Sequence, residues 1–152
     1  MAKDIEVNGL DELVARFDAY PAVYEAEETK VVVTSMLILQ ENVPPYPPKP
    51  MNSRYRRTGT LGRSIGIMEG GGRLGFPSIF KVTKIGPHRE GHFGTNLNYA
   101  PDVIGDKSQQ DPFFAAYWWR LEQVIGPSYN KIKEAFNVFT GRLAKYLEGK
   151  GL

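Results

Sequence analysis

Near the amino terminus, apolar residues recur at the spacing of an α-helix. The first such face consists of Leu10, Leu13, Val14 and Phe17. Asn8 precedes this face and belongs to a residue type that caps helices. Pro21 suits the first turn of a second helix, which we expect to continue to about Glu41. The alternation of polar and apolar residues from Asp4 to Val7 predicts a short strand before this helix pair.

The other end of the chain carries a longer apolar seam. Its residues step by three and four, and they are Tyr129, Ile132, Phe136, Phe139, Leu143 and Tyr146. We expect this helix to start after a break at Gly126 and Pro127, and to pack on the sheet and on the amino-terminal helix. An earlier helical stretch is expected from Pro112, with one indole of Trp118 and Trp119 turned away from the core.

Between these helices the pattern predicts strands. Leu61–Met68 and Ser78–Ile85 are expected to form a hairpin with a glycine-rich tip over Glu69–Gly75. Gly91–Leu97 is expected to be a third, shorter strand, and Tyr99–Ile104 a helical turn. We therefore expect an α+β fold, in which a small antiparallel sheet packs against a long amino-terminal helix and a carboxy-terminal helix. The β-branched run within the amino-terminal segment leaves a strand as the alternative there, but the length of the segment favours a helix.

At 152 residues the chain is expected to be a single domain, 1–152. Within it, residues from about 43 to 58 are rich in proline, which favours an extended arm that rises ~3.1 Å per residue. We expect this arm to leave its own core and to reach an adjacent subunit or ring. The residues proposed for that contact are Pro44, Pro45, Tyr46, Pro47, Pro48, Arg54, Tyr55, Arg56 and Arg57. Arginines beside tyrosines also suit single-stranded nucleic acid, although a protein carboxylate is the preferred partner.

Charge is unevenly distributed, although the formal net charge is only +2. Residues 1–41 carry nine acidic and three basic side chains, residues 42–89 one and nine, and residues 90–152 seven of each. The basic middle third suits nucleic acid, or the acidic first third of a neighbouring copy, or a solvated surface. The chain has no cysteine and hence no disulfide, and its longest apolar stretch falls far short of the ~20 residues that span a membrane.

The sequence contains no residue set that predicts catalysis. His88 and His92, with Glu90 between them, are the only metal candidates, but a catalytic zinc site needs three protein ligands. The glycine-rich stretch Gly70–Gly75 lacks the lysine and hydroxyl residue of a phosphate-binding loop. We therefore expect a non-enzymatic protein with no cofactor and no metal.

Three short motifs follow one another in the chain. A Thr-Gly-x-Leu-x-x-Ser-Ile element is followed by Gly-Thr-Asn and then by Tyr-Ala; the residues are Thr58, Gly59, Leu61, Ser64, Ile65, Gly94, Thr95, Asn96, Tyr99 and Ala100. In this order and spacing they resemble the neck, or tail-completion, proteins of long-tailed bacteriophages. The acidic residue that usually follows Tyr-Ala in that family is absent here, where Val103-Ile104-Gly105 stands.

The resemblance implies a structural virion protein of the head-tail joint. Its partners would be copies of itself in a ring, expected to be six-fold, the head-closure protein, and the tail terminator or tail tube, with no membrane. DNA would pass transiently and without sequence specificity, with Arg73, Lys81 and Lys84 as candidate channel residues. The protein would lie in the virion neck, and in the host cytoplasm during assembly. The alternative is a nucleic-acid-binding protein that uses the basic residues 49–89.

Overall fold

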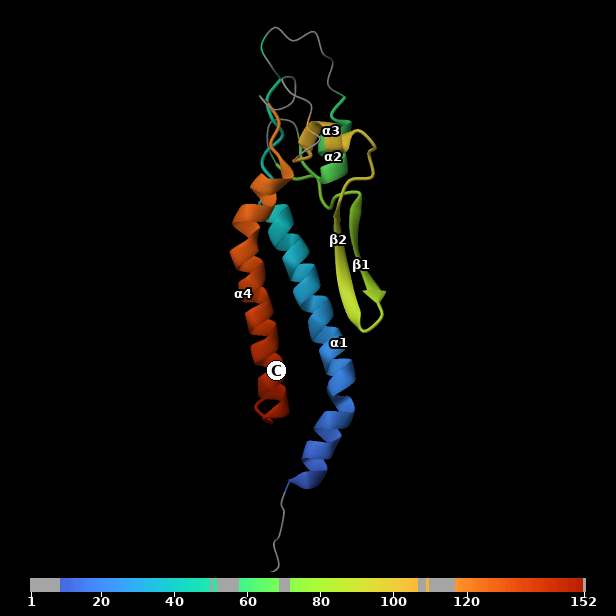
Figure 1. The fold of residues 1–152 in the computed structure, drawn as a ribbon, viewed down its shortest axis with the longest axis vertical. Helices are drawn as coiled ribbons and strands as arrows, with labels where there is room; N and C mark the ends of the chain where they lie inside the picture. The colour runs from blue at the N-terminus through green and yellow to red at the C-terminus, as the bar shows by residue number, and fades with distance from the viewer. Residues whose placement is uncertain are drawn as a thin grey trace, which may run out of the picture.

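The computed structural model describes residues 9–49, 51, 58–68, 72–106, 109 and 117–151. In chain order its elements are α1 (Leu10–Glu41), α2 (Thr60–Ile65), β1 (Ile79–Ile85), β2 (His88–Gly94), α3 (Ala100–Ile104) and α4 (Leu121–Leu147) (Figure 1). The described chain is α+β, because a two-stranded antiparallel sheet accompanies a long amino-terminal helix and a carboxy-terminal helix. The predicted fold class is confirmed.

The long helix α1 lies between α4 and the β1–β2 hairpin (Figure 1). Its contact with α4 is an apolar cluster of Val31 and Val32 from α1 with Phe139 and Leu143 from α4. Val82 of β1 packs against the same cluster. The prediction that the carboxy-terminal seam packs on the amino-terminal helix is therefore confirmed, whereas the sheet packs chiefly on α1.

Both long helices are continuous where the sequence predicted breaks. Pro21 lies inside α1 and Pro127 inside α4, so the expected helix pair and the expected break at Gly126 and Pro127 are both wrong. A proline within a helix removes one backbone hydrogen bond. Both prolines are exposed, so water can satisfy the carbonyl groups that are left unbonded. The strand predicted at 4–7 and the helix start predicted at 112 lie outside the described residues.

The hairpin forms between other segments than the sequence predicted. β1 pairs with β2 from Ile79 opposite Gly94 to Ile85 opposite His88, across a two-residue link that begins at Gly86. Gly86 has a φ of 59°, the positive value that such tight links require. The strand predicted at 78–85 is confirmed, and the one predicted at 91–97 lies three residues earlier.

The predicted strand Leu61–Met68 is wrong, since its first part is helix α2. Gly59 before α2 and Gly66 after it both have a positive φ, so glycine conformations bound a helix of only six residues. What remains of the predicted pairing is a single antiparallel bridge between Ile67 and Arg73. On either side of the expected tip, the described residues therefore meet at this bridge and at a hydrogen bond from the N–H of Met68 to the carbonyl oxygen of Gly72, rather than in two long strands.

A second apolar core lies where α2 and α3 meet the start of α4 (Figure 1). Its buried residues are Tyr46, Leu61, Ile65, Ile67, Ala100, Val103, Ile104, Trp119 and Val124. Trp118 packs against this core, with its ring centroid 5.1 Å from that of Tyr46. The expectation that one indole leaves the core is wrong, because both indoles precede α4 and are not held at helical angles. The helical turn predicted at 99–104 is confirmed as α3.

Candidate functional site

The three sequence motifs converge beside the second core. Ser64 of α2 and Thr95, which follows β2, have hydroxyl oxygens 2.7 Å apart. Leu61, Ile65 and Ala100 are buried in the core next to them. Residues that are distant in sequence therefore form one junction, which joins α2, the end of β2 and the start of α3.

Other motif residues shape or border this junction. Gly59 precedes α2 with a φ of 68°, and Arg63 Nη2 donates a 2.8 Å hydrogen bond to the carbonyl oxygen of Thr58. Gly94 is the last residue of β2. The side chains of Thr58, Asn96 and Tyr99 are exposed. The motif thus divides into a buried part that holds the junction and an exposed part that is free to meet a partner.

The first residues of the proline-rich arm pack on their own chain. Tyr46 is only 6% exposed and Pro47 is buried, so the expectation that the arm leaves its own core is wrong for these two residues. Pro45 and Pro48 are exposed and Pro44 is half-buried. The remaining proposed contact residues, Arg54, Tyr55, Arg56 and Arg57, lie outside the described residues.

Sequence reasoning missed two residues that fix this part of the chain. A Cβ atom at Gly62 would lie 2.3 Å from the ring of Tyr46, so only glycine lets the ring pack on α2. Gln40, buried near the end of α1, donates a 2.6 Å hydrogen bond to the carbonyl oxygen of Gly75. A polar residue on an apolar helix face was the available signal for Gln40, and glycine inside a short helix was the signal for Gly62.

An open apolar cleft of about 780 Å³ adjoins the junction. Motif residues line part of it, namely Ile65, Gly94, Thr95, Asn96 and Ala100. Trp119, Val124 and Ile125 also line it. None of the described residues that line the cleft is acidic, basic or histidine, so this surface offers packing and a few amide and hydroxyl groups rather than acid-base chemistry.

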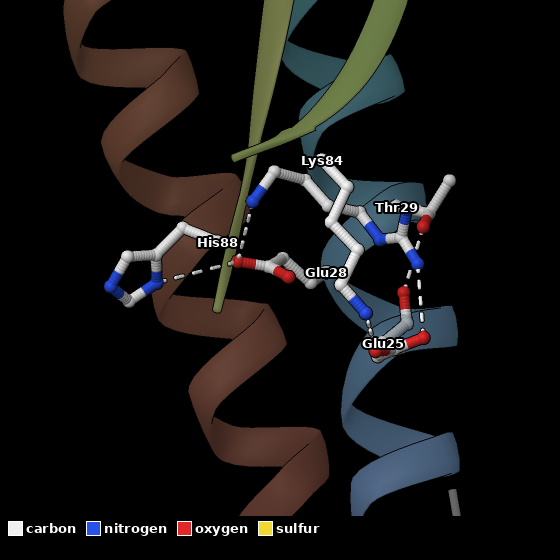
Figure 2. Close-up of polar contacts among 6 residues, drawn as sticks. Glu25, Glu28, Thr29, Lys84 and His88 are labelled. Atoms are coloured by element: carbon white, nitrogen blue, oxygen red, sulfur yellow. Dashed lines mark hydrogen bonds and ion pairs between the residues drawn. The ribbon is translucent and has the colours of Figure 1, made fainter. Parts of the chain in front are cut away.

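A cluster of charges holds the hairpin against α1 (Figure 2). The Glu25 carboxylate accepts hydrogen bonds from Lys84 Nζ and, at 3.2 Å, from Arg89 Nη2. Glu28 Oε1 accepts the backbone N–H of Arg89 at 3.3 Å and lies 4.0 Å from His88 Nδ1. The hydrogen bond and positive charge of Lys84, followed by the charge of Arg89, lower the pKa of Glu25 below its ordinary value of 4.5.

These pairs bear on the candidate channel residues. Lys84 is paired with Glu25 of α1, so part of its charge is already neutralised within its own chain. Lys81 points from the same strand with its side chain exposed, and Arg73 is exposed beside α2. The three residues therefore differ in how much positive charge they offer to a partner.

The two histidines are held by other contacts. His92 Nε2 lies 2.8 Å from Thr83 Oγ1 across the hairpin, and His88 faces Glu28 of α1. Within the described ranges, no group of three or more histidine, aspartate or glutamate residues is placed to hold a metal ion.

Large apolar side chains are exposed on three parts of the surface. The start of α1 exposes Leu10, Val14 and Phe17, and α4 exposes Ile125, Tyr129, Phe136 and Val138. Phe76 and Leu74, before β1, form the third group. Exposed apolar groups of this size are typical of surfaces that meet other proteins.

No family model, curated protein or solved structure matches this chain. In the part of the chain that the structure describes, no helix is both long and apolar enough to cross a membrane.

Proposed function

We propose that this protein is a non-enzymatic neck subunit of a tailed bacteriophage, which forms a ring between the head-closure ring and the tail and lets DNA pass. The observation that carries the proposal is the junction at Ser64 and Thr95. These residues belong to separate motifs of the neck-protein resemblance, and their hydroxyl groups are in contact. A shared structural task explains why the motifs occur together and in that order.

The exposed surface supports assembly into a ring. A ring subunit contacts its two neighbours through two different patches, so the same chain needs more than one interaction surface. The start of α1 and helix α4 carry separate groups of exposed apolar residues, including Phe17 and Tyr129.

The charge arrangement favours this proposal over a dedicated nucleic-acid-binding protein. Two of the basic residues between 49 and 89, Lys84 and Arg89, are paired with Glu25 in the same chain. A cation that is already paired with a carboxylate is less available to neutralise a phosphate and to displace the counterions of the nucleic acid. The basic region is therefore a weaker phosphate-binding surface than its sequence implies. A weak and diffuse positive charge suits DNA that slides past without being held.

The uncharged lining of the apolar cleft supports a structural task rather than a catalytic one. General acid-base and nucleophilic mechanisms need a titratable or activated group at the reacting centre. The polar side-chain groups of the described lining residues are those of Thr95, Asn96 and Asn98 and the indole N–H of Trp119, and none of these is an acid or a base. We propose that the cleft receives apolar side chains of a neighbouring protein in the assembled joint.

The direct test is to remove the gene for this chain from the phage that carries it and to image the particles. The proposal expects filled heads and finished tails that stay separate, and their joining when the wild-type chain is supplied. Antibody against the chain should label the joint between head and tail. Normal joined particles without the gene would overturn the proposal, and so would label on another part of the virion.

A further inference from the structure

The hairpin has one covered edge and one open edge. β2 lies next to α1, while β1 is the outer strand (Figure 1). A Cβ atom at Gly91 of β2 would lie 2.9 Å from Val32 and 3.0 Å from Met36, which demonstrates how closely β2 approaches α1. Among the described residues, no strand pairs with the outer edge of β1.

The register identifies the backbone groups on the open edge. The N–H of Arg89 bonds to Glu28 outside the sheet, so Arg89 and its partner Lys84 turn their backbone groups away from each other. Because this orientation alternates along a strand, Lys84, Val82 and Phe80 direct their N–H and C=O groups outward from β1. Such a row of backbone groups is a template for one more strand.

A segment of the same sequence has the pattern that this edge requires. Residues 4–7 alternate acidic and apolar side chains, Asp-Ile-Glu-Val. On β1, exposed Lys81 lies on one face, and Val82 and Phe80 lie on the other. On that second face, Val82 packs against the cluster between α1 and α4, and the ring of Phe80 lies near that of Phe93. An added strand would place its acidic residues beside Lys81 and continue the apolar face with Ile5 and Val7.

The segment cannot reach this edge within its own chain. Lys84 contacts Glu25, which is sixteen residues along α1 from Gly9 and therefore about 24 Å away at 1.5 Å per residue. Asp4 is five residues before Gly9, so even a fully extended connection reaches only about 18 Å. Val82 and Phe80 lie farther still, since Val82 packs beside Val31 and Val32.

We propose that residues 4–7 of one copy add as a strand to the outer edge of β1 in a second copy. This is a head-to-tail contact, because the donor segment and the acceptor edge are different surfaces of the chain. The inference rests on the proposed function, because that function requires copies of the chain to assemble. It adds to the proposal by naming one contact through which the copies join.

The absence of native cysteine permits a specific test with the full chain. Single-cysteine variants Glu6→Cys and Lys81→Cys are mixed at high concentration and gently oxidised, and the mixed disulfide is quantified by mass. The control mixture replaces the second partner with Lys133→Cys, an exposed lysine of α4. We expect at least a five-fold higher yield for the Lys81 pair. Equal yields would overturn the inference, and so would a disulfide formed within single chains of the Glu6→Cys/Lys81→Cys double variant.

A second comparison keeps one pair of introduced thiols and changes only the backbone of the donor segment. Ile5→Pro removes a backbone donor from the donor segment and leaves the residues of both cores unchanged, while Ala2→Pro is the matched control. We expect Ile5→Pro to lower the yield of the Asp4→Cys plus Lys81→Cys disulfide at least five-fold, and Ala2→Pro to leave it unchanged. If both prolines have the same effect, the strand addition is refuted.

The two proposals can fail separately. Suppose that heads and tails fail to join without the gene, but that the Glu6→Cys and Lys81→Cys pair gives no more disulfide than its Lys133→Cys control. This result would refute the strand addition and leave the neck function in place. A high disulfide yield between the Glu6→Cys and Lys81→Cys variants, together with normally joined particles when the gene is removed, would refute the neck function and support the strand addition.

Discussion

Ser64 and Thr95, 31 residues apart in the chain, are joined by a hydrogen bond of 2.7 Å between their hydroxyl groups. This bond is the middle one of three consecutive hydrogen bonds, all of which run in the same donor-to-acceptor direction. The backbone N–H of Leu97 donates to Thr95 Oγ1 at 3.2 Å, and Ser64 Oγ donates to the carbonyl oxygen of Leu61 at 2.8 Å. Each hydroxyl has one hydrogen, so Thr95 must be the donor to Ser64. Two motifs are thereby linked through one continuous series of bonds.

Breaking this series should destabilise the junction. We expect Ser64→Ala to lower the free energy of unfolding by about 1 kcal/mol, because it leaves the Thr95 hydroxyl without its acceptor. Urea unfolding measures the effect. Ser35→Ala is the matched control, since Ser35 is also half-buried but bonds only to Val31 in its own helix. The double variant with Thr95→Val should lose less than the sum of the two single losses, and strict additivity would argue against the bond.

A methyl group at position 62 should be poorly tolerated. The Cβ of Gly62→Ala would overlap the ring of Tyr46 at 2.3 Å, so we expect a loss of roughly 1–3 kcal/mol in the free energy of unfolding. Gly141→Ala in α4 is the control, because no atom lies within 4 Å of its new Cβ. That substitution should instead stabilise the protein by roughly 0.5–1 kcal/mol.

The interpretation of Gly62 depends on the ring rather than on the short helix itself. Gly62→Ala combined with Tyr46→Leu should lose less than the sum of the two single losses, because a smaller side chain leaves room for the methyl group. If the Gly62→Ala protein is as stable as wild type, the close contact between α2 and Tyr46 does not exist in solution.

The sequence predicted helices at both ends of the chain, although it broke each of them at a proline, and it misplaced α2 and β2 for a physical reason. The apolar seam of α4, which includes Phe139 and Leu143, repeats every three and four residues over several turns. That repeat identifies a helix without any knowledge of what packs against it. The six residues of α2 carry no such period, and Gly59 and Gly66 determine its ends through backbone conformations that a hydrophobic pattern does not express. The β-hairpin was misplaced because three glycines at 70–72 were a more obvious turn signal than Gly86 with Pro87.

The charge cluster between α1 and the hairpin should make stability depend on pH. The pKa of Glu25 is lowered in the folded protein, so its contribution is present above the ordinary value of 4.5 and is lost as pH falls through the lower folded value. We expect Glu25→Gln to be less stable than wild type at pH 7, and the difference to shrink as the pH falls below 4.5 and the Glu25 carboxylate becomes protonated. Urea unfolding at a series of pH values measures this.

An exposed glutamate outside the cluster serves as the control for that series. Glu134→Gln removes an exposed carboxylate from α4, on the other side of α1 from the hairpin (Figure 1), and it is the surface substitution with which the Glu25→Gln series is compared. High salt should also reduce the difference between wild type and Glu25→Gln, since Glu25 is partly exposed and its ion pairs are screened. A constant difference between these two proteins at every pH would contradict the assignment.

Glu27 should depend on Arg142 for its place between α1 and α4. Its side chain is only 3% exposed, and its two oxygens contact Lys30 Nζ at 2.5 Å and Arg142 Nε at 3.2 Å. We expect Arg142→Ala to cost roughly 1–3 kcal/mol in the free energy of unfolding, because a buried carboxylate oxygen loses its donor. Lys133→Ala, at an exposed position of the same helix, should change it by less than about 0.5 kcal/mol.

A double variant distinguishes the loss of the ion pair from the loss of packing contacts. Replacing both residues, as in Glu27→Leu with Arg142→Leu, removes the buried charge together with its partner. This double variant should be more stable than Arg142→Ala. A double variant that is less stable than the single one would indicate that Arg142 acts through contacts other than Glu27.

The candidate site could be predicted only in part. The motif residues were identified from their order, but nothing in that order indicated that Ser64 and Thr95 touch while Asn96 and Tyr99 stay exposed. Contacts between hydroxyl groups depend on how β2 and α2 meet, and that arrangement follows from tertiary packing. The burial of Tyr46 was missed for the same reason, since prolines on both sides favour an extended backbone but do not determine what that backbone packs against.

The proline-rich segment should therefore separate into a structural part and an assembly part. We expect Tyr46→Ala to cost about 3–5 kcal/mol in the free energy of unfolding, because the ring is buried against Trp118 and α2. Changing Arg54, Arg56 and Arg57 together to serine should leave that free energy within about 0.5 kcal/mol of wild type. In the neck proposal these arginines meet a neighbouring protein, so the triple variant should fail to join heads to tails when supplied to a phage that lacks the gene. A triple variant that restores joined particles would remove the arginines from the assembly contact, while Tyr46 would keep its place in the core.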